Sequence, residues 1–277
     1  MAKHWENKTI VVAGGSSGLG FAIARAFHQQ GAFVVLLART ETKLTDAVES
    51  LESSGQGVGE SMTKRATGFS VDLADATAVE NVVEEVVQLR GGIDVWVNAV
   101  GQSTRVNFSE ATLQNYRELM DQNFFTVVNG TYTVLELLDR SKGHLVNIGS
   151  LASKTAWPYM SPYVTSKHAL AGFTNQLRLE GPKSVHYLFV CPGPIDAQEN
   201  SVRYETADGM CEKAAQPGAG APVKLIDPDW LATKIVAACE KRKPELVVPG
   251  KSRILFGLLQ LWPRIGNALL NRIAPKA

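Results

Sequence analysis

Short apolar runs rich in β-branched residues recur along the first 190 residues of the chain. Runs of this kind are typical of strands that are buried on both faces of a sheet. The sequence predicts them at residues 9–13, 33–37, 66–71, 93–97, 144–148 and 185–190, and a final strand at 246–248.

Stretches with helical periodicity lie between these runs, at residues 21–30, 41–51, 76–89 and 113–138. Alternation of strands and helices predicts a parallel sheet with helices on both faces, and ligands bind such sheets at the carboxyl ends of the strands. We therefore expect an α/β fold: a Rossmann-type doubly wound parallel sheet of about seven strands in three α/β/α layers. One domain is expected over residues 1–250, with a substrate-loop insertion near 197–228 that is rich in Ala, Gly, Pro and polar residues.

The last segment, residues 251–277, carries apolar stripes edged by arginines. Pro263 is expected to kink or split this helical extension because proline cannot continue a helix. A basic amphipathic segment can lie on a membrane surface. It can equally cover its own core or a partner subunit, and the sequence leaves both interpretations open.

Composition narrows the function classes. The formal net charge of +1 gives no reason to expect a nucleic-acid partner. Cys191, Cys211 and Cys239 are scattered, which suits a reducing compartment and offers neither a disulfide framework nor a zinc site. The N-terminus lacks the apolar region of a secretory signal. A cytoplasmic protein without a bound metal is expected, with peripheral membrane contact open for residues 251–277.

A glycine-rich turn follows the first predicted strand and precedes an apolar helix. Glycines permit a tight turn, let the backbone approach a pyrophosphate and aim the helix N-terminus at its charge. A tight turn alone also needs glycine, but the position after the first strand favours nucleotide binding. The residues of this predicted phosphate site are Gly14, Ser16, Ser17, Gly18, Leu19 and Gly20.

The second predicted strand is followed by Ala38 and Arg39. An NAD site commonly has an acidic residue here to accept a bond from the ribose 2′-hydroxyl. Ala38 accepts none, whereas Arg39 offers a charge-assisted contact to a 2′-phosphate. NADP(H) is therefore favoured over NAD(H).

Tyr163 and Lys167 are four residues apart, so a helix presents both on one face. An ammonium group nearby favours the phenolate and lowers the tyrosine pKa from its usual value near 10. Tyr163 then becomes a workable general acid and base. The pair is a weak motif alone, since chance produces it often.

Other features accompany the pair in a fixed order. Ser150 lies just after the predicted strand at 144–148, Asn123 lies within the long predicted helix, and Pro192-Gly193 follows the sixth strand. Together with the GxxxGxG spacing of the glycine turn, this arrangement resembles the short-chain dehydrogenase/reductase family, in its short, non-extended branch. The resemblance covers roughly residues 8–250.

The resemblance implies an oxidoreductase that interconverts a ketone or aldehyde and an alcohol with NADP(H), and a homodimer or homotetramer. It implies that Tyr163 is the acid and base, that Ser150 orients the carbonyl and that Lys167 also holds the nicotinamide ribose. It implies that Asn123 anchors a proton-relaying water. The remaining cofactor-binding residues that it implies are Asp72, Leu73, Asn98, Ala99, Tyr163 itself, Pro192, Gly193 and Ile195.

Four positions depart from the family pattern: Ala13 replaces Thr before the glycine turn, Val97 replaces the first Asn of the family's NNAG motif, Val100 replaces its Gly, and Ala197 stands where Thr is frequent. Ala13 removes a hydroxyl contact to the turn, Val100 crowds the adenine-ribose side, and Ala197 removes a contact to the carboxamide or phosphate. Asn98 is expected to brace a neighbouring strand.

Two other function classes were weighed. A serine hydrolase is disfavoured because Ser150 lacks the GxSxG elbow and no histidine has a pattern that ties it to this serine. A non-catalytic NADP-binding regulator on the same fold would typically lose the Tyr or the Lys, and both are present.

The substrate pocket is expected between residues 102–108, residues 151–160 and the 197–228 insertion. Trp157, Tyr159 and Met160 make it apolar and favour a lipophilic substrate, although they could simply pack the insertion. Arg105 and Lys154 are candidates to meet an anionic group, or exposed cations without such a role.

Overall fold

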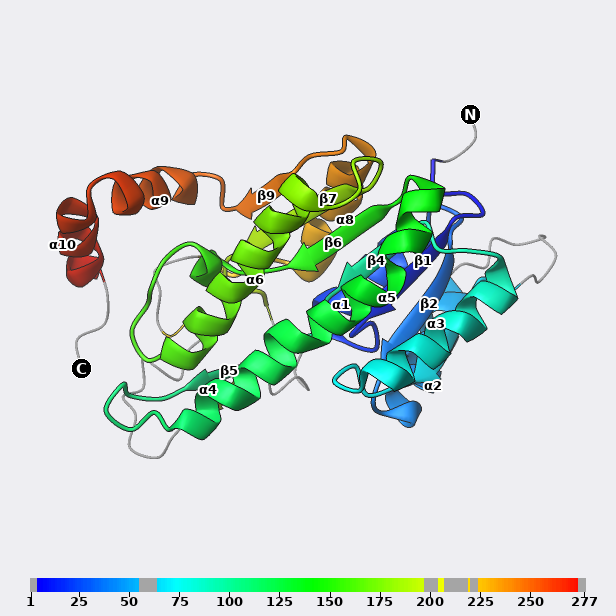
Figure 1. The fold of residues 1–277 in the computed structure, drawn as a ribbon, viewed down its shortest axis with the longest axis horizontal. Helices are drawn as coiled ribbons and strands as arrows, with labels where there is room; N and C mark the ends of the chain where they lie inside the picture. The colour runs from blue at the N-terminus through cyan, green and yellow to red at the C-terminus, as the bar shows by residue number, and fades with distance from the viewer. Residues whose placement is uncertain (1–3, 55–63, 197–203, 207–218, 220–223, 274–277) are drawn as a thin grey trace.

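The computed structural model describes residues 4–54, 64–196, 204–206, 219 and 224–273 (Figure 1). Most of the 197–228 insertion and the polar stretch at 55–63 therefore lie outside the described residues.

A seven-stranded parallel sheet forms the centre of the molecule, with the strand order β3-β2-β1-β4-β6-β7-β9. The predicted doubly wound parallel sheet is thereby confirmed, and each predicted strand is present with its ends shifted by at most two residues. The strands are β1 (Thr9–Ala13), β2 (Phe33–Ala38), β3 (Ala66–Ser70), β4 (Val95–Asn98), β6 (His144–Ile148), β7 (His186–Pro192) and β9 (Glu245–Val248).

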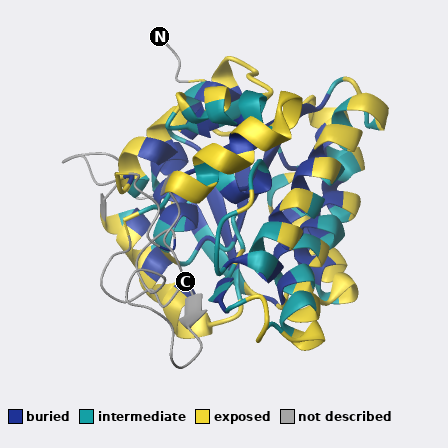
Figure 2. Ribbon diagram, turned by 90° about the vertical axis from the view of Figure 1, so that its left-hand side faces the viewer, coloured by how far each residue is buried: buried dark blue, intermediate teal, exposed yellow. Residues whose placement is uncertain are grey.

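Helices cover both faces of this sheet, because alternate side chains of each buried strand enter two different cores. Ile10 and Val12 of β1 pack with α1 (Gly18–His28), α2 (Glu41–Ser54) and α8 (Pro228–Glu240). Val11 and Ala13 pack on the other face, which is covered by α3 (Ala76–Arg90), α5 (Thr126–Ser141) and α6 (Ser161–Glu180). Figure 2 shows the buried strands between helices whose outer sides are exposed.

The strand order reverses between β1 and β4. The chain runs outward through β2 and β3, then returns to build β4, β6, β7 and β9 on the other side. The loops after β1 and β4 consequently diverge at their carboxyl ends, which opens the crevice where such sheets bind ligands.

The long helix predicted over residues 113–138 is interrupted. It consists of α4 (Leu113–Met120), a π-helical turn η1 (Asp121–Phe125) and α5. A two-stranded sheet, β5 (Ser103–Arg105) with β8 (Tyr204–Thr206), was also not predicted. Both features depend on neighbouring elements, so local periodicity gives no signal for them.

Two helices, α9 (Ser252–Leu261) and α10 (Pro263–Ile273), form the C-terminal extension. The split occurs at Pro263, as the sequence predicts. Figure 1 shows the pair projecting beyond β9 at one end of the molecule.

A buried histidine pair makes stability depend on pH. Nδ1 of His144 lies 2.8 Å from Nδ1 of His186, so one ring donates and the other accepts. Burial, followed by the electrostatic interaction with His186, lowers the pKa of His144 to about 3, and burial also lowers the pKa of His186. His144 is therefore neutral in the folded protein at neutral and mildly acidic pH, whereas the unfolded chain protonates it near pH 6.5.

Acidification is expected to destabilise the fold through this pair. Between pH 6.5 and pH 5 His144 becomes protonated in the unfolded state but stays neutral in the folded state. This difference lowers the free energy of unfolding by about 2 kcal/mol. Urea denaturation across this range measures the slope. His144→Gln should flatten it, whereas His168→Gln, at an exposed helix position, should not. An unchanged slope in His144→Gln would refute the assignment.

Candidate functional site

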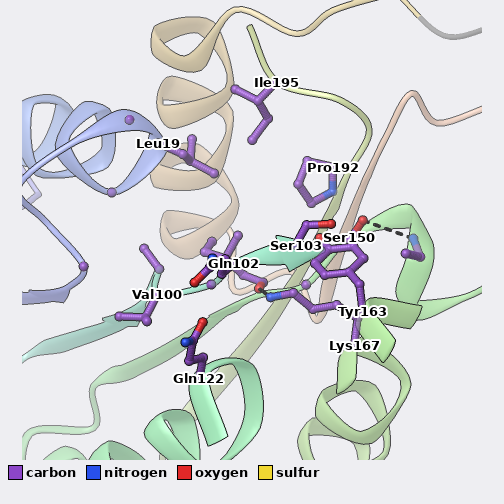
Figure 3. A pocket seen from close by; sticks show the side chains of 18 of the residues that line it. Leu19, Val100, Gln102, Ser103, Gln122, Ser150, Tyr163, Lys167, Pro192 and Ile195 are labelled. Carbon is purple, nitrogen blue, oxygen red and sulfur yellow. Dashed lines mark hydrogen bonds between the residues drawn. The ribbon is translucent and has the colours of Figure 1, made fainter. Parts of the chain in front are cut away.

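A cavity of about 1680 Å³ opens at the carboxyl ends of the central strands. It extends from the turn after β1, past the loops after β2 and β4, to the start of α6 and the segment after β7. In Figure 3 Ser150, Tyr163 and Lys167 gather on one side of the cavity and Leu19 lies on the other. The cavity thus joins the predicted phosphate site to the predicted catalytic residues.

The phosphate end is built by the turn between β1 and α1. A Cβ added to Gly20 would lie 2.1 Å from the carbonyl oxygen of Gly14, so the turn closes only without a side chain there. Ser17 precedes α1 without a side-chain cap on its first N–H groups. These N–H groups and the positive helix end face the cavity, and this donor set fits a pyrophosphate.

Two cations stand at the end of β2. Arg39 and Lys43, both exposed, line the cavity together with Ser16 and Ser17. Ser70 of β3 donates a hydrogen bond to the backbone carbonyl of Arg39 at 3.0 Å, which ties the two strand ends together. Sequence reasoning missed Lys43, which lies on the first turn of α2 while Arg39 lies in the loop before that helix.

Tyr163 and Lys167 lie on the first turns of α6, and both line the cavity. Lys167 Nζ lies 5.9 Å from the centre of the Tyr163 ring. Ser150 follows β6, and its Oγ accepts a hydrogen bond from the backbone N–H of Ala152 at 3.1 Å. Since that contact uses an acceptor lone pair, the hydroxyl proton of Ser150 is available to a ligand oxygen in the cavity.

Lys167 is the most constrained of these residues. Its side chain is only 3% exposed, and Nζ donates to the carbonyl oxygen of Ile148 at 3.0 Å. Burial lowers the pKa of Lys167 to about 8, because an ammonium group in the interior loses its hydration. At neutral pH the ammonium group is still protonated. Because its pKa of about 8 lies close to neutral pH, it can release this proton more readily than an ordinary lysine.

Asn123 lies in the π-helical turn and is fully buried. It holds the Gln102 backbone at both ends, accepting from its N–H at 2.8 Å and donating to its carbonyl at 2.9 Å. Its Nδ2 also donates to Ser166 Oγ at 2.9 Å, and Ser166 in turn donates to the carbonyl of Tyr163. A widened turn re-aims side chains at functional sites. Here it links the loop after β4 to the catalytic helix.

Gly101 marks the gap beside this network. A Cβ there would lie 3.2 Å from Lys167 Nζ and 3.3 Å from Asn123 Oδ1. Because Gly101 has no side chain, a space remains that both Lys167 Nζ and Asn123 Oδ1 border. Gly101 belongs to this site, although the sequence analysis gave it no role.

Of the other predicted cofactor residues, all but Asn98 line the cavity. Asn98 is buried in the core, where it accepts from Trp96 Nε1 at 2.7 Å and donates to Asn147 Oδ1 at 2.8 Å. It therefore braces the neighbouring strand, as its sequence context suggested, and does not reach the cavity. The residues that do are Asp72, Leu73, Ala99, Pro192, Gly193 and Ile195.

The end of the cavity beyond the catalytic residues is apolar. Leu151, Trp157 and Met160 line it, as expected, and the Trp157 indole donates to the carbonyl of Ala219 within the insertion. Tyr159, which was expected beside them, is not among the lining residues; its backbone carbonyl accepts a hydrogen bond from the N–H of Val106 at 3.0 Å. The C-terminal helices contribute further apolar side chains that sequence reasoning missed, namely Leu255, Phe256 and Leu270. No local pattern signals that a segment so distant in the chain returns to this cavity.

The two candidate cations of this region have different surroundings. Lys154 forms a 2.7 Å ion pair with Glu245, so it is not an exposed cation awaiting an anionic ligand. Arg105 is buried at the cavity wall and donates to Ser103 Oγ at 2.6 Å.

Comparison with known proteins identifies the family. The family model described as short chain dehydrogenase matches residues 8–208. The chain belongs to the short-chain dehydrogenase family. A zebrafish (Danio rerio) dehydrogenase/reductase SDR family member 7B is 31% identical over 94% of this chain and 83% of its own length. An uncharacterized oxidoreductase of Bacillus subtilis is 28% identical over 98% of this chain and 73% of its own.

Solved structures of a short-chain dehydrogenase and of an alcohol dehydrogenase share the fold. One from Streptomyces avermitilis superposes with a TM-score of 0.77 at 24% identity, over 94% of this chain and 98% of its own. An alcohol dehydrogenase from Thermococcus sibiricus, complexed with 5-hydroxy-NADP, gives a TM-score of 0.71 at 23% identity, over 87% and 95%.

Two searches of the described residues concern metals and membranes. No group of three or more His, Cys, Asp or Glu residues is placed to hold a metal ion within that part of the chain. None of the helices described is both long and apolar enough to cross a bilayer.

Proposed function

We propose that the protein is an NADP(H)-dependent oxidoreductase that interconverts a lipophilic ketone or aldehyde and the corresponding alcohol. One observation supports this above others. A single cavity has two cations and an open helix N-terminus at one end, Ser150, Tyr163 and Lys167 in the middle, and an apolar wall at the other end. Family membership is consistent with this chemistry.

The chain's own residues divide the work of reduction. Bound NADPH would supply the hydride. Ser150 donates a hydrogen bond to the substrate carbonyl, and Tyr163 gives its phenolic proton to the oxygen as negative charge develops there. The Lys167 ammonium favours the resulting phenolate. The Asn123–Ser166 hydrogen bonds position the first turn of α6, so that both side chains keep their places.

The direct experiment measures turnover by the purified protein. NADPH and NADH are each offered with a series of ketones of increasing apolar size, and the reverse reaction is run with the alcohols. Faster turnover with NADPH and with the larger apolar ketones supports the proposal. Tight NADPH binding without turnover of any carbonyl compound would instead favour a non-catalytic NADP-binding regulatory protein on the same fold.

Arg39→Gln tests the cofactor preference. Loss of one charge-assisted contact to the 2′-phosphate should lower the NADPH:NADH ratio of kcat/KM by about 10- to 100-fold, mainly by raising KM for NADPH. Lys43→Gln, which removes the second cation, should shift the ratio in the same direction. Arg117→Gln, at an exposed position of α4 outside the cavity lining, is the matched control and should leave it unchanged. An unaltered ratio in both cavity variants would refute the 2′-phosphate assignment.

A further inference from the structure

The outer face of α9 and α10 is unusually apolar for a surface. Among the described residues, thirteen large apolar side chains are strongly exposed, and five of them lie on this short extension. The other eight are distributed over the rest of the described surface, where single exposed apolar residues are ordinary. The five are Ile254 (72% exposed), Leu261 (70%), Trp262 (55%), Ile265 (58%) and Leu269 (38%).

The opposite face of the same helices is anchored on the protein. Phe256 of α9 is buried in a core cluster with Phe189 and Val247, and with Leu255 and Leu270 it lines the cavity. Helical spacing separates the two faces: Ile254 and Leu261 are seven residues apart on α9, and Ile265 and Leu269 are four apart on α10. The two helices are therefore packed on the protein by their inner face, and the apolar outer face is not exposed through detachment from the core.

The charge of the extension is of one sign. After Glu245 the chain has no acidic residue, but it has five basic ones, Lys251, Arg253, Arg264, Arg272 and Lys276. Arg253 lies 3.7 Å from Glu245, whereas no ion pair involves Arg264 or Arg272 in the described part of the chain. If a second copy of the chain docked by the same face, the cations of the two copies would lie opposite each other and repel. An anionic surface would neutralise them.

We propose that the outer face of α9 and α10 docks on an anionic lipid membrane. Each helix is too short to span a bilayer, so the pair would lie in the interfacial plane with its apolar side chains among the acyl chains. Trp262, at the bend between the helices, suits the headgroup boundary, where indole rings concentrate. Since the inner face lines the cavity, docking brings this end of the cavity to the lipid surface. Entry of a lipophilic substrate from the bilayer rests on the proposed function; the docking itself does not.

Vesicle co-sedimentation tests the docking without any activity measurement. The unchanged protein should sediment with vesicles that contain phosphatidylserine and stay largely in solution with pure phosphatidylcholine. High salt should release it, because the charge attraction is screened. The triple variant Ile254→Gln/Leu261→Gln/Ile265→Gln should lower partitioning onto the anionic vesicles by at least about tenfold.

A matched control separates this face from general surface hydrophobicity. Leu89→Gln/Leu113→Gln/Leu179→Gln removes three equally exposed leucines from other parts of the surface and should partition like the unchanged protein. Circular dichroism and NADPH binding show that both triple variants are folded. Equal partitioning of the two variants, or failure of the unchanged protein to bind anionic vesicles, would overturn the proposal. So would a dimer that the tail variant converts to a monomer, with no change in vesicle binding.

Tryptophan emission supplies a second readout that does not depend on the triple variant. Anionic vesicles should shift the emission of the unchanged protein to shorter wavelength as Trp262 leaves water. Trp262→Phe should abolish this shift, whereas Trp230→Phe, at another exposed indole (47%), should retain it. A shift that survives in Trp262→Phe would place the contact elsewhere on the molecule.

Discussion

Replacing Tyr163 with phenylalanine is expected to lower kcat for carbonyl reduction by about 10²- to 10⁴-fold. The phenylalanine ring keeps the packing at the start of α6 but has no proton to give to the substrate oxygen. NADPH affinity should change little, since the phosphate end of the cavity is formed by other residues. Stopped-flow measurement of NADPH oxidation in single turnovers separates the chemical step from cofactor binding.

Tyr132→Phe is the matched control for this substitution. Tyr132 is 73% exposed on α5, so the same hydroxyl is lost far from the cavity. Its rate should equal that of the unchanged protein. Turnover by Tyr163→Phe within a factor of about three of the control would show that another group donates the proton.

Lys167→Met is expected to lower activity to a similar extent and, at the same time, to stabilise the fold. The lowering of the Lys167 pKa to about 8 implies that burying its ammonium costs about 3 kcal/mol at neutral pH. The substitution also removes the hydrogen bond from the ammonium group to the Ile148 carbonyl, which is worth about 1.5–3 kcal/mol because the donor is charged. The balance leaves a gain of up to about 1.5 kcal/mol in the free energy of unfolding.

The pH dependence of this gain has a definite sign. Below pH 8 Lys167 is protonated in the folded and unfolded states, so the full cost of burial is present. As pH rises above 8 the folded state releases its proton while the unfolded state keeps it, and the unchanged protein becomes relatively more stable. The advantage of Lys167→Met should therefore be largest below pH 8 and shrink toward pH 10.

Urea denaturation at pH 7 and pH 9.5 measures both effects. Lys241→Met, which replaces an exposed lysine at the end of α8, serves as control and should show neither. If Lys167→Met were less stable than the unchanged protein at pH 7, the ammonium would have to be stabilised by its surroundings. That result would contradict the prediction that the buried Lys167 ammonium lowers the stability of the fold.

The unfavourable burial of Lys167 gives a physical reason for the arrangement around it. If an apolar side chain at this position is more stable, as expected, the chemistry of the site accounts for the ammonium. Gly101 and Asn123 border the same group and leave room beside it. These groups together leave a polar gap beside Lys167, in the part of the cavity that Tyr163 also lines.

The sequence by itself determined the elements that depend on neighbours along the chain. Alternating and continuous apolar runs located the seven strands, and Pro263 located the break in the extension. The glycine turn, Ser150 and the Tyr163–Lys167 pair could each be placed at the end of a strand or on one face of a helix, and the resemblance to the short-chain dehydrogenases implied their roles. Such patterns are local, so no knowledge of the packing is needed to read them.

Only the tertiary structure decided what the distant segments do. Asn98 lies in the core and hydrogen-bonds to Asn147 on the neighbouring strand, and Lys154 forms an ion pair with Glu245. Asn123 lies in a π-helical turn, where it binds the backbone of the loop after β4. The tertiary structure also brings α9 and α10 back to the cavity while exposing their apolar outer face. These outcomes depend on which surfaces meet across the sheet, and contacts between residues so far apart in the chain leave no periodic trace in the sequence.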